Sequence, residues 1–261
     1  MEYPESSSLV SRLEVVPEAG STNDELVRRA GGPDSDGWPD FSVLLTEHQT
    51  AGRGRLGREW VSRPGASLIV SVLLRPGSGT DGVPLERYSW FPLVAGLAMA
   101  RAIDGLVDGD VSVKWPNDVL IDGLKVCGVL AELLQDGRGI VIGSGVNLGL
   151  DADELPVPTA TSLKTAGARD FASDTVLARY LGELRELYTD LSGPGDEPLR
   201  RVREAVSARC GSLGREVRVE LPSGSVLTGT ATGIDETGRL ILRGNDGTSV
   251  VAAGDVTHLR Y

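Results

Sequence analysis

The chain has 261 residues, of which 40% are hydrophobic, and its formal net charge is −11 at pH 7. This length suits one large globular domain, or one domain with a small appendage. The acidic balance argues against a chain that works on nucleic acid, because such proteins need a basic surface.

Targeting signals are missing from the sequence as well. No run of about 18 apolar residues is present, which excludes a membrane-spanning helix. The polar start at residues 1–8 lacks the apolar core of a secretion signal. Two cysteines far apart in the chain, Cys127 and Cys210, suit a reducing compartment. We therefore expect a cytoplasmic protein.

The first predicted strand, residues 13–16, is followed by a pattern typical of a helix start. Thr22-x-x-Glu25 matches a capping box, with apolar residues behind it at helical spacing. Taken alone, this pattern favours a structural role in which Ser21, Thr22 and Asn23 only cap the helix. The same hydroxyl and carboxamide groups at a helix N-terminus can also bind a polar ligand.

An apolar predicted strand, residues 41–47, leads into residues 52–57, which spell G-x-G-x-x-G. A dinucleotide site needs a helix directly after these glycines, with its N-terminus on the pyrophosphate. Pro64-Gly65 would break that helix, so we reject a Rossmann site. Residues 51–64 contain four arginines and one acid. We interpret them as a mobile loop whose guanidinium groups bind carboxylate or phosphate oxygens and close it over a ligand.

A long strand is predicted at residues 67–75, a loop at 76–84, and a helix with a broad apolar face at 87–106. The stretch VKWPNDVLIDGLKVCGVLAE, residues 113–132, then has the pattern of paired strands, with a break at the proline and a tight Asp-Gly turn. Two of the three lysines in the chain flank an Asn-Asp pair at this break. A lone pair of this kind favours a solvated turn.

The strand predicted at residues 140–148 is apolar on both faces, which is typical of a central strand. Residues 156–168 form a loop that is either a lid or an inert connection, and the sequence leaves both open. Helices are predicted at 177–191 and 199–209. From residue 213 onward, short strands alternate with hairpin turns. We therefore expect a catalytic domain at 1–211 and a small barrel at 212–261.

Other kinds of site lack support in the sequence. Two histidines and two cysteines spread along the chain make a structural zinc site unexpected. No G-K-[ST] phosphate loop and no G-x-S-x-G nucleophile elbow occurs.

Four stretches, in this order and within residues 21–149, resemble the motifs of biotin protein ligases. They are Ser21-Thr22-Asn23, GRGRLGREW from Gly52, KWPND from Lys114 with a lysine seven positions after its Asp, and GSGVNLG from Gly143. The chain from Leu213 onward resembles the small C-terminal barrel of the same family. The chain is identified as a monofunctional member, without an N-terminal DNA-binding domain.

The resemblance implies an α+β fold, in which a mixed β-sheet flanked by helices forms a class II synthetase-like catalytic domain beside a small SH3-like β-barrel. It implies an ATP-dependent ligase that activates biotin as biotinyl-5′-AMP and transfers biotin to a lysine of biotin carboxyl-carrier domains. ATP with Mg²⁺ is the expected nucleotide substrate, and no side chains are expected as fixed metal ligands.

Residue roles follow from the same resemblance. The expected catalytic residues are Lys125, Arg53 and Arg55, because cations must offset the two reacting anions, and Asp118, which would orient or deprotonate the incoming carrier lysine. The expected biotin-binding residues are Ser21, Thr22, Asn23, Gln49, Gly52, Arg53, Arg55, Lys125, Gly128 and Gly143. The expected nucleotide-binding residues are Arg55, Arg58, Trp60, Asn117, Lys125 and Asn147.

Two alternatives remain to be weighed. A lipoate or octanoate transferase of the same fold group would share the sheet and a lysine, but such proteins usually lack the KWPND and GRGRxGR pair. A biotin-sensing DNA-binding repressor would need several dozen residues before Ser21, where this chain has twenty. The expected partners are therefore carrier domains of biotin-dependent carboxylases, without DNA or membrane, and the expected state is a monomer or weak homodimer.

Overall fold

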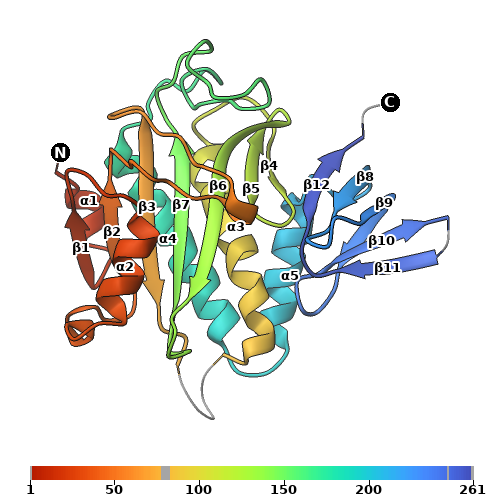
Figure 1. The fold of residues 1–261 in the computed structure, drawn as a ribbon, viewed down its shortest axis with the longest axis horizontal. Helices are drawn as coiled ribbons and strands as arrows, with labels where there is room; N and C mark the ends of the chain where they lie inside the picture. Colours follow the sequence, from red (N-terminus) through yellow and green to blue (C-terminus); the bar gives the residue numbers. More distant parts are fainter. Residues whose placement is uncertain (1, 78–82, 246, 260–261) are drawn as a thin grey trace.

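The computed structural model describes residues 2–77, 83–245 and 247–259. Residues 78–82 of the predicted 76–84 loop lie outside the described residues. The described chain forms a seven-stranded sheet with helices on both faces and, beside it, a separate five-stranded sheet (Figure 1). The predicted α+β fold, with a mixed sheet and a small C-terminal β-domain, is confirmed.

The larger sheet has the strand order β1, β2, β3, β7, β6, β5, β4. Strands β1 and β2 are parallel, and all other neighbours in this sheet are antiparallel. The strands are β1 (Arg12–Val15), β2 (Ser42–Thr46), β3 (Ser67–Leu74), β4 (Val111–Lys114), β5 (Asp118–Ile121), β6 (Leu124–Leu133) and β7 (Ile140–Asn147). As predicted, β7 lies at the centre.

Helices cover both faces of this sheet, which explains why the central strands are apolar throughout. On one face α3 (Phe91–Asp104) packs against α4 (Ser173–Ser192), and α2 (Thr22–Ala30) lies on the other (Figure 1). The remaining helices are α1 (Pro4–Ser7), α5 (Glu197–Arg209) and the short 3₁₀ helices η1 (Ser35–Gly37), η2 (Arg55–Gly57) and η3 (Leu85–Trp90). The 3₁₀ turn η3 replaces the first turn of the helix predicted at 87–106.

The start of α2 corrects the capping-box prediction. Ser21, not Thr22, is the N-cap, and its hydroxyl accepts a hydrogen bond from the backbone N–H of Asp24 at 3.4 Å. Glu25 does not reach back to the cap. Its carboxylate instead binds Arg28 and Arg29 one turn later. Thr22 is therefore free of the capping role and lies inside the first turn.

The C-terminal residues form a second, antiparallel sheet with the order β11, β10, β9, β8, β12. Its strands are β8 (Glu216–Glu220), β9 (Val226–Ile234), β10 (Leu240–Gly244), β11 (Gly247–Val251) and β12 (Asp255–His258). Helix α5 ends at Arg209, so the boundary predicted between residues 211 and 212 falls within the connection to β8. That boundary stays a prediction.

Two buried tryptophans of the larger domain hold the barrel in place. The indole of Trp115 donates to the carbonyl of Gly238 at 3.0 Å, and the indole of Trp90 donates to that of Glu236 at 2.9 Å. The backbone N–H of Trp115 also donates to the hydroxyl of Ser212 at 3.2 Å. Because Trp115 belongs to the KWPND stretch, its two bonds attach the barrel to that stretch, and the bond from Trp90 attaches the barrel to η3.

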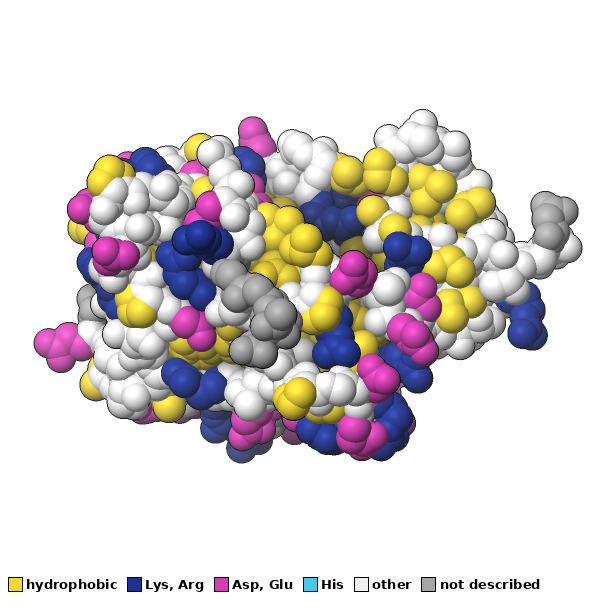
Figure 2. All heavy atoms as spheres, turned by 90° about the horizontal axis from the view of Figure 1, so that it is seen from below, with side chains coloured by type: hydrophobic (Ala, Val, Ile, Leu, Met, Phe, Trp, Pro, Cys, Tyr) yellow, Lys and Arg dark blue, Asp and Glu magenta, His cyan; other side chains and the backbone are white. Residues whose placement is uncertain are grey.

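The surface mixes charges of both signs. Figure 2 shows the molecule from below, where acidic and basic side chains are interspersed with hydrophobic ones. Among the residues that the structure describes, no helix combines the length and apolar character needed to cross a membrane.

Candidate active site

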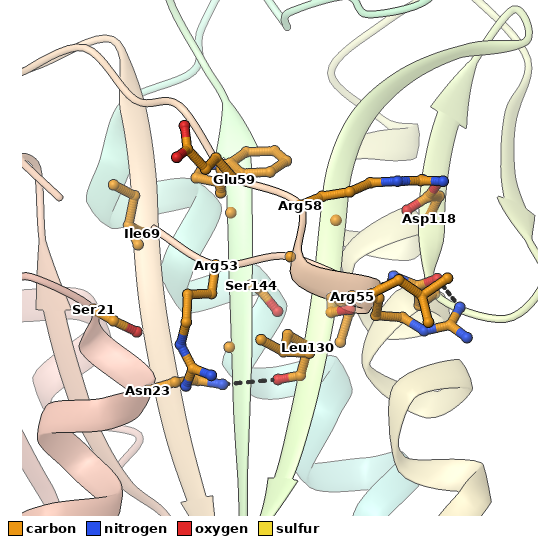
Figure 3. A pocket seen from close by; sticks show the side chains of 18 of the residues that line it. Ser21, Asn23, Arg53, Arg55, Arg58, Glu59, Ile69, Asp118, Leu130 and Ser144 are labelled. Atoms are coloured by element: carbon orange, nitrogen blue, oxygen red, sulfur yellow. Dashed lines mark hydrogen bonds between the residues drawn. The ribbon is translucent and has the colours of Figure 1, made fainter. Parts of the chain in front are cut away.

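One pocket brings together nearly all the predicted site residues (Figure 3). It lies between the N-terminus of α2, residues 51–64 (the arginine-rich loop), and strands β3, β7, β6 and β5. The turn before β12 of the barrel adds Gly254. The predicted residues that line it are Ser21, Thr22, Asn23, Gln49, Arg53, Arg55, Arg58, Trp60, Asn117, Asp118, Lys125, Gly128 and Gly143. Gly52 and Asn147 are the predicted residues outside this lining.

Buried polar groups form one end of the pocket. Gln49 Oε1 accepts the backbone N–H of Thr22 at 2.9 Å, which fixes the orientation of the Gln49 amide. The hydroxyl of Ser71, on β3, lies 2.8 Å from Thr22 Oγ1 and 2.7 Å from Asn23 Oδ1. Buried polar groups are costly unless they are hydrogen-bonded, so this end is built for a polar head group.

Asn23 is more tightly held than the other residues of this end. Its amide nitrogen donates to the carbonyl of Leu130 at 3.1 Å and to the Glu132 carboxylate at 2.8 Å. Both amide protons are therefore used within the protein. The predicted biotin-binding role of Asn23 can involve only its oxygen.

Glycines make room for the side chains that cover the floor. A Cβ at Gly143 would lie 2.3 Å from Asn23 Oδ1, and one at Gly145 would lie 2.4 Å from the ring of Trp60. These distances are too short for any side chain. Strand β7 therefore carries glycine so that Asn23 and Trp60 can lie flat against it. The indole N–H of Trp60 is buried and has no partner within the described chain.

Cations gather at the other end around one carboxylate. Lys125 Nζ lies 2.7 Å from Asp118 Oδ1, and Lys114 Nζ lies 3.4 Å from Asp118 Oδ2. Arg55 donates to Asn117 Oδ1 at 2.8 Å (Figure 3). Burial lowers the pKa of the Arg55 guanidinium, and the nearby Asp118 opposes that shift. The break at Pro116 therefore turns the KWPND residues toward the pocket, and the solvated-turn interpretation does not hold.

The arginine-rich loop is tied to the protein at several points. Arg53 binds Asp24 on α2 and Glu132 on β6, the latter at 2.8 Å, and its side chain runs toward Asn23 (Figure 3). Arg58 binds Asp255 of the barrel, and Arg63 binds Glu154. The sequence predicts a mobile loop that closes through its contacts with a ligand. The structure instead supplies protein carboxylates as counter-charges, so the loop already covers the pocket.

Asp255 joins this site from the barrel. Burial alone would raise the pKa of its carboxyl, but the hydrogen bond from Arg58 and the charges of Arg58, Lys114 and Arg55 outweigh burial and lower it. The pKa of Arg58 is raised, mainly by its hydrogen bond to Asp255. Residues of the barrel thus form part of the pocket wall.

Asn147 and the 156–168 loop are linked to each other. The amide of Asn147 donates to the carbonyl of Thr161 at 3.0 Å. Backbone bonds from Lys125 to Thr159 and from Thr161 to Lys125, both 2.8 Å, attach the same segment to β6. Of the two interpretations left open, a lid and an inert connection, these bonds favour a fixed connection, which packs behind Lys125. Gly52, the other predicted residue outside the pocket lining, shapes the arginine-rich loop. A Cβ at Gly52 would lie 2.3 Å from the carbonyl oxygen of Trp60.

Several site residues were not predicted. Ser71 could have been found as a polar residue within the apolar strand β3. Glu132 could have been found because it lies two positions after the pocket residue Leu130 on β6, and therefore on the same strand face. Lys114 was visible in the motif but received no role. Nothing in the sequence places Asp255 near Arg58.

Comparisons with known proteins support this picture. Residues 21–147 match the model of the biotin/lipoate A/B protein ligase family, and residues 212–259 match the biotin protein ligase C-terminal domain. The biotin–[acetyl-CoA-carboxylase] ligase of Mycobacterium tuberculosis is 40% identical over 253 residues, which cover 95% of this chain and 90% of that protein. The ligase of the same name from Paracoccus denitrificans is 34% identical over 248 residues, which cover 90% and 96%.

A solved structure agrees with these relatives. The biotin protein ligase from Aquifex aeolicus in complex with biotin and ATP is similar with a TM-score of 0.77 and 27% identity, covering 96% of this chain and 100% of that one. The regions matched by the two family models include all the predicted site residues and Asp255.

Proposed function

Since the chain belongs to the biotin protein ligase family, we propose that this single pocket performs both steps of the reaction, with biotin at the polar end and nucleotide at the cationic end. The protein is a ligase that activates biotin as biotinyl-5′-AMP and transfers the biotin to a carboxylase. The carrying observation is the convergence of Lys125, Arg55 and Asp118 in the pocket that also contains the buried polar groups around Thr22.

The first step joins two anions. A carboxylate oxygen of biotin forms a bond to the α-phosphorus of ATP, the bond to the bridging oxygen breaks, and pyrophosphate leaves with that electron pair. Lys125 and Arg55 offset the charge that grows on the α-phosphate. Both are already held in place, by Asp118 and Asn117, so little reorganisation accompanies the reaction.

In the second step the amine of a carrier lysine attacks the carbonyl carbon of biotinyl-AMP, and AMP leaves. The attacking amine must first lose its proton. Asp118 was expected to orient or deprotonate it. Because this carboxylate lies against Lys125 and Lys114, its charge is largely compensated. We therefore assign Asp118 mainly the orienting role, which includes holding Lys125.

The nucleotide end rests on Asn117, Arg58 and Trp60. We propose that the Trp60 ring stacks with the adenine, since its indole N–H is buried without a partner and its ring lies flat on Gly145. The Asn147 side chain holds the segment around Thr161, which is in turn hydrogen-bonded to the backbone of Lys125. Its role is thus indirect in this arrangement.

Magnesium is proposed to arrive with ATP. Within the described residues, no group of three or more His, Cys, Asp or Glu side chains is placed to hold a metal ion. The acids nearest the phosphate end, Asp118 and Asp255, are already paired with cations. The ion would add positive charge to the departing pyrophosphate, as part of the substrate.

The remaining proposals concern partners and location. We propose carrier domains of biotin-dependent carboxylases as the protein partners, no DNA or membrane partner, a monomer or weak homodimer, and a cytoplasmic location. The mixed surface charge and net charge of −11 support the absence of DNA binding. Gel-shift binding tests the absence of a DNA partner, and sedimentation tests the oligomeric state.

The function is tested without any carrier protein. The protein is incubated with radiolabelled biotin, ATP and Mg²⁺, and acid-labile biotinyl-AMP is separated by thin-layer chromatography. We expect about one adenylate per active site, retained on the protein. Absence of the adenylate, with ATP and biotin both present, would contradict the proposed function.

A further inference from the structure

Glu132 lies at the junction of the polar end of the pocket and the arginine-rich loop. Its carboxylate accepts from Asn23 Nδ2 at 2.8 Å and from Arg53 Nη2 at 2.8 and 3.1 Å. It is two positions after Leu130 on β6, so its side chain lies on the same strand face as that pocket residue. The reaction described above gives Glu132 no role.

The donors and acceptors around Asn23 fix the orientation of its amide. Leu130 presents a carbonyl and Glu132 a carboxylate, and both groups can only accept hydrogen bonds. Turning the amide over would place its oxygen against two acceptors. Asn23 Oδ1 must therefore face Ser71, whose hydroxyl lies 2.7 Å away.

This orientation decides where the next proton lies. The Ser71 hydroxyl has one proton, and it must be donated to Asn23 Oδ1, because an amide oxygen carries none. The Ser71 hydroxyl also lies 2.8 Å from Thr22 Oγ1. One proton cannot serve both oxygens fully, so with that proton on Asn23 Oδ1 the Thr22 hydroxyl is the group left to donate across this contact. Gln49 Oε1 is a poorer alternative acceptor for Thr22, at 3.4 Å, and already accepts the Thr22 backbone N–H.

With its proton committed to Ser71, Thr22 Oγ1 presents only lone pairs to the pocket. We propose that Glu132 is a positioning residue with two linked effects. It fixes the direction of the hydrogen-bond chain through Asn23, Ser71 and Thr22, so that the pocket selects a head group with an N–H donor. It also holds Arg53, so that the loop stays over the pocket. The proposal rests on the proposed function, in which the head group is the ureido ring of biotin.

The neighbouring residues allow the two effects to be separated. Asp24 also binds Arg53, but the hydrogen bonds of the Asn23 side chain among the described residues go to Leu130, Glu132 and Ser71 instead. Ser71 belongs to the hydrogen-bond chain but does not touch Arg53. Asp24→Asn should therefore disturb only the loop, Ser71→Ala only the head-group selection, and Glu132→Gln both.

The selection is measured as a ratio of affinities. Calorimetry compares biotin with the two cyclic carbamates in which one ring N–H of the ureido group is replaced by oxygen. A site built around a hydrogen bond rejects the analogue that lacks the donor. The informative analogue is the carbamate whose ring oxygen replaces the N–H that faces Thr22. Glu132→Gln and Ser71→Ala should each reduce the ratio of the biotin affinity to the affinity for this carbamate by about tenfold, the equivalent of one such bond. Asp24→Asn should leave the ratio unchanged.

The loop is measured by trypsin in the absence of ligand. Cleavage after Arg53, Arg55 and Arg58, followed by mass spectrometry, should be severalfold faster in Glu132→Gln and Asp24→Asn than in the wild type or Ser71→Ala. Thermal unfolding of every variant establishes that the fold is retained. Glu132→Asp keeps an acceptor-only carboxylate and should preserve the discrimination better than Glu132→Gln.

The outcomes are distinct. If the wild type does not bind biotin, the proposed function itself fails. If it binds biotin but Glu132→Gln leaves either the discrimination ratio or the cleavage rate unchanged, the role of Glu132 is wrong. Equal losses of discrimination in the Asp and Gln variants would likewise overturn the argument from the direction of the chain.

Discussion

Arg58 and Asp255 lie 197 positions apart in the chain and form an ion pair that joins the active-site loop to the barrel. The tryptophan contacts near Gly238 attach the barrel to the KWPND strands. The loop is thus tied to the strands beneath it through a second domain. Through this connection the barrel helps to hold the active-site loop in place over the pocket.

The first prediction concerns this ion pair. Asp255→Asn should raise the KM for ATP severalfold with a smaller change in kcat, because Arg58 would no longer be held in place before the nucleotide arrives. Pyrophosphate release is followed as a function of ATP concentration. Glu236→Gln, which removes an exposed carboxylate from another turn of the barrel, is the matched control and should behave as the wild type. An unchanged KM for ATP in Asp255→Asn would show that the Arg58–Asp255 ion pair does not contribute to nucleotide binding.

The second prediction concerns Lys125. Lys125→Ala should reduce adenylate formation on the order of 10²-fold or more, because it removes a charge placed at the reacting phosphate. The fold should persist, since the side chain is partly exposed. The control is Lys164→Ala, the third lysine of the chain, which binds only Asp151 and neighbouring acids on an exposed loop. If the two variants form the adenylate at comparable rates, Lys125 is a surface lysine without a catalytic role.

The third prediction concerns Arg55. Biotinyl-AMP is a mixed anhydride that any free amine can attack, so it must stay enclosed until the carrier arrives. Arg55→Gly removes the bond to Asn117 that holds the loop tip over the pocket. We expect it to form the adenylate more slowly, because one charge at the α-phosphate is lost, and to release it faster, so that albumin added as a bystander becomes biotinylated. Arg63→Gly, in the same loop but bound to Glu154, is the control.

A different result would redefine Arg55. If Arg55→Gly stops adenylation without any rise in the off-rate of biotinyl-AMP, the guanidinium stabilises the transition state, and its part in retaining the intermediate is small.

The fourth prediction separates biotin from lipoate. Gln49 and Thr22 offer polar partners to a ureido ring, which lipoate and octanoate lack, and groups left unpaired in a buried site are costly. Calorimetry should show tight binding of biotin and negligible binding of the other two acids. Similar affinities for all three would favour the lipoyl alternative.

The fifth prediction concerns pH and His258 of the barrel. Burial lowers the pKa of this imidazole to about 4 from 6.5, with the charges of Arg215 and Lys114 acting in the same direction. Between those two pH values the unfolded chain binds a proton that the folded chain does not, so stability falls as the pH decreases through this range. His258→Gln should reduce the slope of the thermal midpoint between pH 7 and pH 4. An identical slope would show that His258 is not the responsible group.

Local patterns predicted most of the fold. The paired strands predicted within residues 113–132 are present as β4, β5 and β6, although β5 is buried on both faces, and the central strand predicted at 140–148 is β7. The N-cap was misplaced by one residue because Ser21 and Thr22 are both good capping residues, and packing of Thr22 against Gln49 and Ser71 decides between them.

The site was predictable where its residues are neighbours in the sequence. Asp118 and Lys125 lie on two paired strands and Asn117 directly precedes the first of them, so their proximity follows from the hairpin. The contacts of Asp255 with Arg58 and of Glu132 with Arg53 depend on long-range packing that no local pattern encodes. The same reason explains Asn147, which lies near the site as expected, but whose amide is taken by Thr161.

The environments of the four tryptophans give the protein an optical reporter. Trp38, Trp90 and Trp115 are at most 2% exposed and lie away from the pocket lining, whereas Trp60 lies over Gly145 within it. Three of the four indoles therefore emit from surroundings that a ligand does not touch. A change in intrinsic fluorescence on adding substrate comes from Trp60 and records, without any label, how the adenine end of the site fills.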